Sequence, residues 1–214
     1  MDDNVIVCVK PAGLPVQSDY SRDMDMTTLL KHQIIRDEEL ESEPYLTAVH
    51  RLDRPVGGLI VFARTKKAAA DLSRQIREGE FEKNYQAVLC GELPEETATW
   101  EDELIKDGKT NETKVVEKGT PGAKHALLDI ELIDCIETKE GPLSWVLITL
   151  HTGRHHQIRV QCASRGLAIY GDRKYNPIWS GKDRKPGGKT GHPAAGLGLY
   201  STRVSFCHPL TGSE

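Results

Sequence analysis

The chain has 214 residues, which is enough to bury a full core as one large domain or as two subdomains. Hydrophobic residues make up 38% and charged residues 28% of the sequence, as in ordinary globular proteins, and no apolar run approaches the length that spans a bilayer. The five cysteines are scattered without a CxxC pair, which argues against a disulfide framework and a cysteine zinc site, and the start of the chain is too acidic for a signal peptide. We therefore expect a cytoplasmic protein with buried thiols and no membrane association.

The formal net charge of −4 hides an uneven distribution along the chain. Residues 1–150 carry 18 Lys and Arg against 29 Asp and Glu, whereas residues 151–214 carry 10 against 3. A basic last third of this kind is expected of a chain with one face that binds nucleic acid. The acidic stretches 37–43 and 92–103 are interpreted as solvated surface.

The first predicted element, within residues 4–17, is a short apolar strand that ends in a Pro–Gly turn. A helix is predicted over residues 26–40, because Leu30 and Ile34 lie one helical turn apart and a threonine stands near its start as a cap candidate.

The apolar run at 58–63 predicts a buried strand, and a helix follows it. Thr65 is suited to cap this helix and Gly79 to end it. Its predicted apolar face consists of Ala69, Leu72 and Ile76.

The second half of the chain alternates or runs apolar in a way typical of strands. Strands are predicted at 84–91, 125–135, 143–151 and 198–210, and a helix at 155–166 with Ile158 and Cys162 facing inward and Gly166 at its end. Because helices and strands do not alternate regularly, the fold class is predicted to be α+β, with a mixed, mainly antiparallel central sheet and flanking helices.

The stretch HRLDRPVGG at residues 50–58 places Asp53 between Arg51 and Arg54, directly before a Pro-Val-Gly-Gly sequence. It predicts either a surface turn with a weak ion pair, or an ionised carboxylate that a glycine turn exposes toward a cleft. The protein-kinase catalytic loop does not fit, since its asparagine and its partner motifs are missing.

Other chemistries lack their motifs. His151, His155 and His156 lie close together, but without HExxH spacing or a nearby carboxylate, so a metal site is not supported. No GxSxG, Walker loop or GxGxxG is present, so acyl transfer, NTP hydrolysis and dinucleotide binding have no support either.

Four segments taken together are much more specific: VKPAGLPVQ (9–17), HRLDRPVGGLIVFART (50–65), EKNYQAVLCG (82–91) and HTGRHHQIRVQCASRGLAIYGDRKYN (151–176). In this order and spacing they resemble the RluA-type pseudouridine synthases, and residues 197–212 resemble that family's closing segment. The resemblance implies a sheet with flanking helices in two halves around a central RNA cleft. It also implies isomerisation of chosen uridines in RNA, with no cofactor and no metal.

The chain departs from the family pattern at two places. Val56-Gly57-Gly58 stands where the family usually has Thr-Ser-Gly or similar, and Gln161 stands where a histidine is frequent. Neither change involves Asp53, so we interpret both as subfamily differences that bear on substrate choice. We expect residues 1–214 to form a single catalytic domain without an N-terminal RNA-binding domain, because the first strand begins at residue 4.

The resemblance assigns three catalytic residues. Asp53 is the carboxylate that attacks the sugar or the base, or relays the proton from C2′. Arg159 is expected to stabilise the ionised carboxylate, because a cation favours the charged form of a nearby acid. Tyr85 is expected to stack on the target base; on its alternating strand alone it would be interpreted as a core residue.

The substrate-binding residues are also expectations. Arg51 resembles the family residue that fills the gap left by a flipped uridine, with a structural ion pair as the competing interpretation. Arg154, near the start of a helix, is suited to phosphate. Lys182, Arg184, Lys185 and Lys189 lie in a glycine-rich stretch that either contacts RNA or is merely solvated.

The expected partner is a ribosomal or transfer RNA stem-loop, bound by a monomer. The alternative function is a catalytically silent RNA-binding or ribosome-assembly protein on the same fold, which ranks below the enzyme because all three expected catalytic residues are present.

Overall fold

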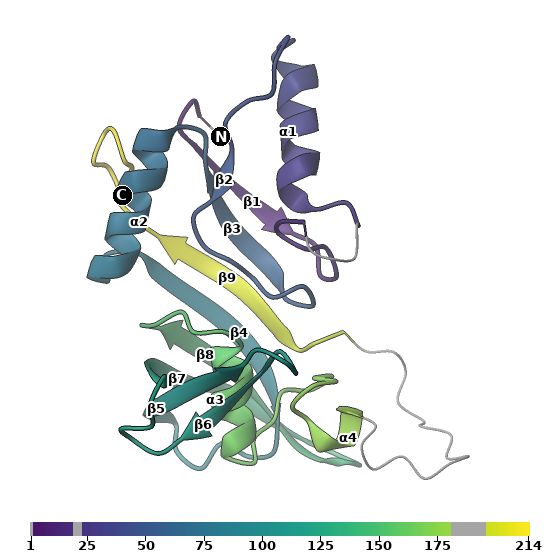
Figure 1. The fold of residues 1–214 in the computed structure, drawn as a ribbon. Coiled ribbons are helices and arrows are strands. Elements are labelled where there is room, and N and C mark those ends of the chain that lie inside the picture. The colour runs from purple at the N-terminus through teal and green to yellow at the C-terminus, as the bar shows by residue number, and fades with distance from the viewer. Residues whose placement is uncertain (1, 19–22, 181–195) are drawn as a thin grey trace. The chain divides into compact units, whose positions relative to one another are not determined.

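The computed structural model describes residues 2–18, 23–180 and 196–214 (Figure 1). The chain divides into two compact units: unit 1 comprises Met1–Lys83 and Ser201–Glu214, and unit 2 comprises Asn84–Tyr200. Helices and mostly antiparallel strands occur in both, which confirms the predicted α+β class.

The strands of unit 1 surround a central strand, β3 (Gly57–Ala63). β1 (Val5–Lys10) and the short β2 (Thr47–Ala48) both pair with it in antiparallel fashion. β9 (Leu199–Ser205), from the far end of the chain, follows β3 in the strand order. Unit 1 is therefore assembled from both ends of the sequence.

The described part of unit 1 contains two helices, α1 (Met26–Asp37) and α2 (Lys66–Glu78). The caps predicted for α2 are confirmed, since Thr65 accepts a hydrogen bond from a first-turn amide and Gly79 adopts a left-handed φ of 77°. For α1 the threonine cap was a wrong prediction, because the Asp25 carboxylate takes that role. α1 also ends at Asp37, before the predicted limit.

The core of unit 1 forms where α2 packs on β1 and β3. Its buried members are Val5, Val61, Ala63, Ala68, Leu72 and Phe81. The predicted apolar face of α2 is correct at Leu72, while Ala69 and Ile76 pack at the margin of this core.

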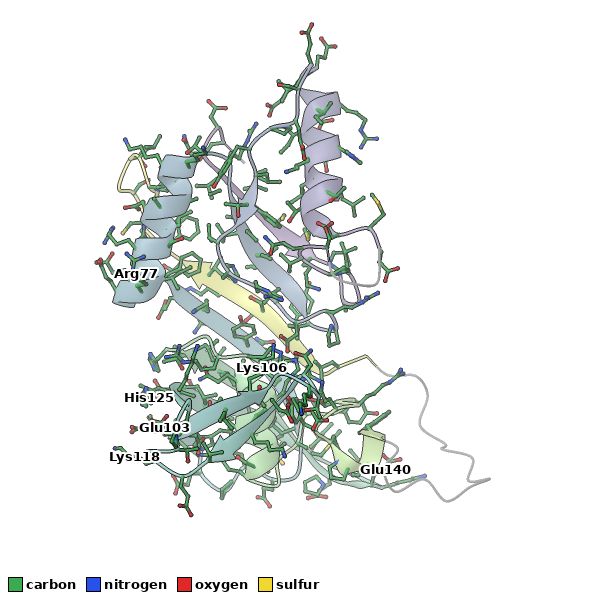
Figure 2. The ribbon with its side chains drawn as sticks, viewed as in Figure 1. Arg77, Glu103, Lys106, Lys118, His125 and Glu140 are labelled. Carbon is green, nitrogen blue, oxygen red and sulfur yellow. The ribbon has the colours of Figure 1, made fainter. Side chains whose placement is uncertain are left out.

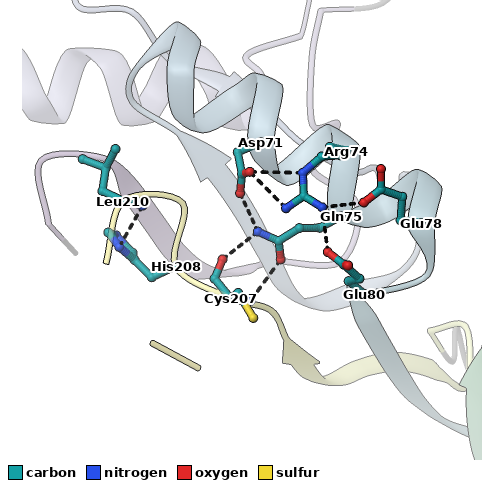
Figure 3. Close-up of polar contacts among 8 residues, drawn as sticks. All are labelled: Asp71, Arg74, Gln75, Glu78, Glu80, Cys207, His208 and Leu210. Carbon is teal, nitrogen blue, oxygen red and sulfur yellow. Dashed lines mark hydrogen bonds and ion pairs between the residues drawn. The ribbon is translucent and has the colours of Figure 1, made fainter. Parts of the chain in front are cut away.

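The end of unit 1 is fastened to α2 by one side chain, Gln75 (Figure 3). Its Nε2 donates to the carbonyl of Cys207 at 2.7 Å and to Asp71 at 2.7 Å, and its Oε1 accepts from the amide of Cys207 at 3.0 Å. The side-chain amide thus pairs with backbone as a strand would, and holds the segment after β9 against the helix.

Unit 2 contains a strand sequence β4-β8-β7-β5-β6 in which every neighbouring pair is antiparallel. These strands are β4 (Glu82–Cys90), β5 (Thr97–Asp107), β6 (Glu112–Val116), β7 (Lys124–Thr138) and β8 (Gly141–Leu150). β5 and β6 were not predicted, and the interpretation of 92–103 as solvated surface is wrong for β5, where Trp100 is buried.

α3 (Gln157–Ser164) contacts β5 and β6, and a short α4 (Pro177–Ser180) follows. Ile158 and Cys162 of α3 are buried, as predicted. Buried thiols are confirmed for Cys162 but wrong for Cys207, which is exposed. In the described part of the chain, no helix is long and apolar enough to cross a membrane.

Candidate active site

Asp53 lies in a tight turn of unit 1, closed by a hydrogen bond of 2.9 Å from the Val56 amide to the Asp53 carbonyl. The glycines that follow are not the exposing turn that the sequence suggested: Gly57 and Gly58 are buried and begin β3. Gly58 has a φ of 119°, and a Cβ there would lie 2.2 Å from the carbonyl oxygen of Ser201. Its role is to let β9 approach β3 closely.

A fully buried lysine, Lys10, supports this turn. Its Nζ donates to the carbonyl oxygens of Leu14 at 2.7 Å, Pro11 at 3.0 Å and Arg54 at 3.1 Å. The amide of Gly13 also donates to the Arg54 carbonyl, at 2.7 Å. The loop after β1 and the residue next to Asp53 are therefore tied to one ammonium group.

The pKa of Lys10 is shifted by burial and by nearby charges. Burial lowers the pKa of Lys10 to about 8, and the negative charge of Asp53 opposes part of this shift. The charge of Asp53 and the charge of the buried Lys10 therefore attract each other. A hydrogen-bonded cation behind the turn favours a single backbone conformation at the aspartate.

The neighbours of Asp53 differ in role. His50 is half-buried: its Nε2 accepts from the Val61 amide at 3.2 Å and its ring lies 5.4 Å from that of Phe81. Arg54 donates through Nε to the Gly13 carbonyl at 3.0 Å. Both contacts indicate structural roles for His50 and Arg54, whereas Arg51 is exposed.

Burial lowers the pKa of His50 to about 4, and the charge of Lys83 adds to this effect. His50 is therefore neutral at physiological pH, with its hydrogen on Nδ1, because Nε2 is used as an acceptor.

Tyr85 and Arg159 belong to unit 2. Tyr85 lies on β4 opposite Ile148 of β8, and its side chain is 5% exposed. Arg159 lies on α3 and is 6% exposed. The structure thus groups the expected catalytic residues as Asp53 in one unit and Tyr85 with Arg159 in the other.

Arg159 forms a side-on ion pair with Asp172, which is fully buried. Nε donates to one carboxylate oxygen and Nη2 to the other, both at 2.8 Å. Burial raises the pKa of Asp172, but the hydrogen bonds and charge of Arg159 outweigh burial, so this pKa lies below its usual value.

A tyrosine packs beside this pair. The guanidinium carbon of Arg159 lies 5.1 Å from the ring centre of Tyr175, within the range of a cation–π contact. The Tyr175 hydroxyl accepts from the Thr113 amide at 2.9 Å and contacts Nδ1 of His156 at 2.6 Å.

Arg154 stands just before α3, where phosphate binding was expected. Its Nε donates to the carbonyl of His125 at 2.7 Å, while its side chain remains exposed. His125 lies on β7, opposite Glu103 of β5 (Figure 2). Lys182, Arg184, Lys185 and Lys189 lie outside the described residues.

Gln161, at the position where the family often has a histidine, is fully buried on α3. Its Nε2 donates to the carboxylate of Asp102 at 2.7 Å and to the Trp100 carbonyl at 3.2 Å, so it holds β5 on the helix. Across the described residues, His, Cys, Asp and Glu form no group of three or more that could hold a metal ion.

Comparison with known families identifies the fold. A family model described as RNA pseudouridylate synthase matches residues 4–164, which include Asp53, Tyr85 and Arg159. The chain belongs to this family. The RluA-type resemblance of the four sequence segments is supported by curated synthases of that type among its relatives.

Two relatives of the synthase family illustrate the similarity. The chain is 33% identical over 219 residues to ribosomal large subunit pseudouridine synthase D of Neisseria meningitidis serogroup B, covering 99% of this chain but 54% of the relative. It is 30% identical over 215 residues to the dual-specificity RNA pseudouridine synthase RluA of Pasteurella multocida, covering 98% of this chain and 86% of the relative. The chain thus spans about half the length of some curated synthases and most of others.

Solved structures of synthase domains share the fold. The human RNA pseudouridylate synthase domain containing 4 superposes with a TM-score of 0.75 at 21% identity, over 96% of this chain and 82% of that one. The human RNA pseudouridylate synthase domain containing 1 gives 0.72 at 23% identity, over 95% and 75%.

Sequence reasoning did not assign roles to Lys10, Asp172 and Tyr175. All three lie inside segments that carried the resemblance, VKPAG and GDRKY, so a signal was present. The sequence could not show which residues these side chains contact. Lys10 donates to the Arg54 carbonyl, and Asp172 accepts from Arg159, only once the chain has folded.

Proposed function

We propose that this chain is an RNA pseudouridine synthase, an isomerase that acts on specific uridines of ribosomal or transfer RNA. The observation that carries the proposal is the family match over residues 4–164, with Asp53 in its motif and in a turn tied to a buried cation. Because relatives are named for the large ribosomal subunit, ribosomal RNA is the first substrate class to test.

The reaction breaks the bond from ribose C1′ to N1 of uracil, turns the base, and joins C1′ to C5. The proton that leaves C5 is balanced by the one that N1 gains, so no atom or electron is added. A base within a stem has to be flipped out before these atoms are accessible.

In this proposal Asp53 is the reacting carboxylate, by attack on the sugar, attack on the base, or proton relay at C2′. Arg159 stabilises its ionised form, and Tyr85 stacks on the target base. Arg51 fills the space left by the base, because a guanidinium plane stacks well on neighbouring bases.

Phosphate contacts are proposed for Arg154 and for the basic stretch with Lys182, Arg184, Lys185 and Lys189, because cations along a groove supply non-specific RNA affinity. The two units are proposed to act as a single catalytic domain, as a monomer in the cytoplasm. Sedimentation of the protein alone and with a stem-loop transcript would report the stoichiometry.

The test compares the wild-type protein with Asp53→Asn on unmodified ribosomal and transfer RNA transcripts, with pseudouridine mapped by carbodiimide labelling. We expect the wild type to produce discrete sites. Asp53→Asn should lower turnover at least a thousandfold while its circular dichroism and RNA affinity stay close to wild type.

Asp37→Asn is the matched control, since Asp37 is an exposed carboxylate at the end of α1 and its loss should leave turnover unchanged. Substantial turnover by Asp53→Asn would remove the aspartate from the mechanism. RNA binding by a wild-type protein that makes no pseudouridine in any transcript would favour the silent RNA-binding alternative.

A further inference from the structure

We infer that Asp172 and Tyr175 are positioning residues for Arg159, holding the edge and the face of its guanidinium in one orientation. The inference rests on the proposed function, because it assigns them to the arginine of that site. Neither residue is proposed to touch substrate.

Asp172 holds the edge of the Arg159 guanidinium through two hydrogen bonds. Nε and Nη2 each donate to a different oxygen of Asp172 at 2.8 Å, and the two side chains are 6% and 0% exposed. A bidentate pair fixes the guanidinium plane as well as its position.

Asp172 is itself fixed before it meets the arginine. Its Oδ1 accepts from the amides of Lys174 at 2.8 Å and Tyr175 at 3.1 Å, so the carboxylate closes a turn on its own backbone. Gly171 precedes it with a φ of 74°, and a Cβ there would lie 2.2 Å from the Gly196 carbonyl oxygen. The carboxylate is therefore part of a rigid turn.

Tyr175 restrains the face of the same guanidinium, 5.1 Å from its ring centre. Its hydroxyl is held by the Thr113 amide on β6 and by His156 at the start of α3. The ring thus has two polar anchors on separate elements, which limit its rotation. Arg159 is consequently confined on two sides by groups that are each anchored elsewhere.

Stability alone does not account for such an arrangement. A buried ion pair is often no more stabilising than apolar residues of similar volume, because removing both charges from water is costly. An oriented cation is instead valuable in a site that must stabilise charge without reorganising during the reaction. The experiment therefore has to distinguish a contribution of the ion pair to stability from a contribution to the orientation of Arg159.

The test measures kcat at saturating transcript, the Kd for RNA and the thermal unfolding of variants. Asp172→Asn should lower kcat at least tenfold with an RNA Kd within twofold of wild type. Asp102→Asn is the matched control, because Asp102 pairs with Arg165 near the end of the same helix at 2.8 Å. Its kcat should stay within twofold of wild type.

A double-mutant cycle separates positioning from a general structural role. In an Arg159→Met background, measured by single turnover, Asp172→Asn should change the rate less than twofold, because it acts through the missing arginine. The same tenfold loss in that background, or a wild-type kcat for Asp172→Asn, would overturn the inference.

Tyr175 provides a second test that keeps the ion pair, and it decides the matter where Asp172→Asn does not fold or Arg159→Met shows no rate. Tyr175→Phe retains the ring over the guanidinium but loses the two hydrogen bonds of the hydroxyl, so kcat should fall by less than threefold. Tyr175→Leu removes the ring and should lower kcat at least threefold. Equal rates for the two would refute the positioning role. A wild-type protein without turnover on any transcript would instead refute the proposed function itself.

Discussion

Acidification from pH 7 to pH 4 should destabilise unit 1 through one residue of the Asp53 segment, His50. Burial lowers the pKa of His50 from its ordinary value of 6.5 to about 4. Above pH 6.5 the imidazole is neutral in both the folded and the unfolded chain. Between 6.5 and 4 only the unfolded chain takes up the proton, so the free energy of unfolding falls as the pH is lowered.

The size of the effect follows from the same values. A full pH unit well inside this interval changes the free energy of unfolding by about 1.4 kcal/mol. The change is smaller near each pKa, so the total between pH 7 and pH 4 is about 3 kcal/mol. His50→Gln removes the titrating group and keeps an oxygen that can accept from the Val61 amide. The variant should therefore lose about 3 kcal/mol less than wild type between pH 7 and pH 4.

The assay is urea unfolding at several pH values, followed by far-ultraviolet circular dichroism. Tryptophan fluorescence is unsuitable because Trp100, Trp145 and Trp179 all lie in unit 2. Other titrating groups are common to both proteins and cancel in the difference. Parallel stability curves for wild type and His50→Gln over this range would refute the reasoning, and with it the buried, neutral state of the imidazole.

Three further changes have separate outcomes. Gly58→Ala should cost about 3 kcal/mol in thermal unfolding, because of its positive φ and the overlap with β9, whereas Gly108→Ala, which meets no atom within 4 Å, should cost far less. Gln75→Leu should cost about 1–2 kcal/mol and speed amide exchange after β9, and unchanged exchange would contradict the clamp. Arg154→Met should weaken RNA binding and leave kcat unchanged. The slope of log Kd against log salt concentration should decrease by the amount expected for about one phosphate contact. An unaltered slope in filter-binding assays would exclude that contact.

The elements that could be predicted from the sequence are those whose ends and buried faces are marked by residues within the element or next to it. Thr65 and Gly79 mark the ends of α2, and Ile158 with Cys162 marks the buried face of α3, because caps and periodicity are local properties. The four motif segments, in their order and spacing, were specific enough to predict the family. These predictions required no knowledge of distant partners.

β5 could not be predicted because its acidic side chains are satisfied by residues far along the chain. Asp102 accepts from Gln161 and from Arg165, and the Arg165 guanidinium lies 4.6 Å from the ring centre of Trp100. A run that is polar by composition therefore has a half-buried face. For the same reason the role of Lys10 depends on a carbonyl 44 residues away.

The assembly of unit 1 from two distant stretches has a consequence during synthesis. The hydroxyl of Ser201 donates to the Leu59 carbonyl at 3.1 Å, a contact between residues 142 positions apart. The ribosome synthesises the chain from its N-terminus, so β9 can pair with β3 only after the whole of unit 2 has been made. The turn that carries Asp53 leads directly into β3, so the nascent chain acquires this neighbourhood in finished form only after almost all of its residues have emerged.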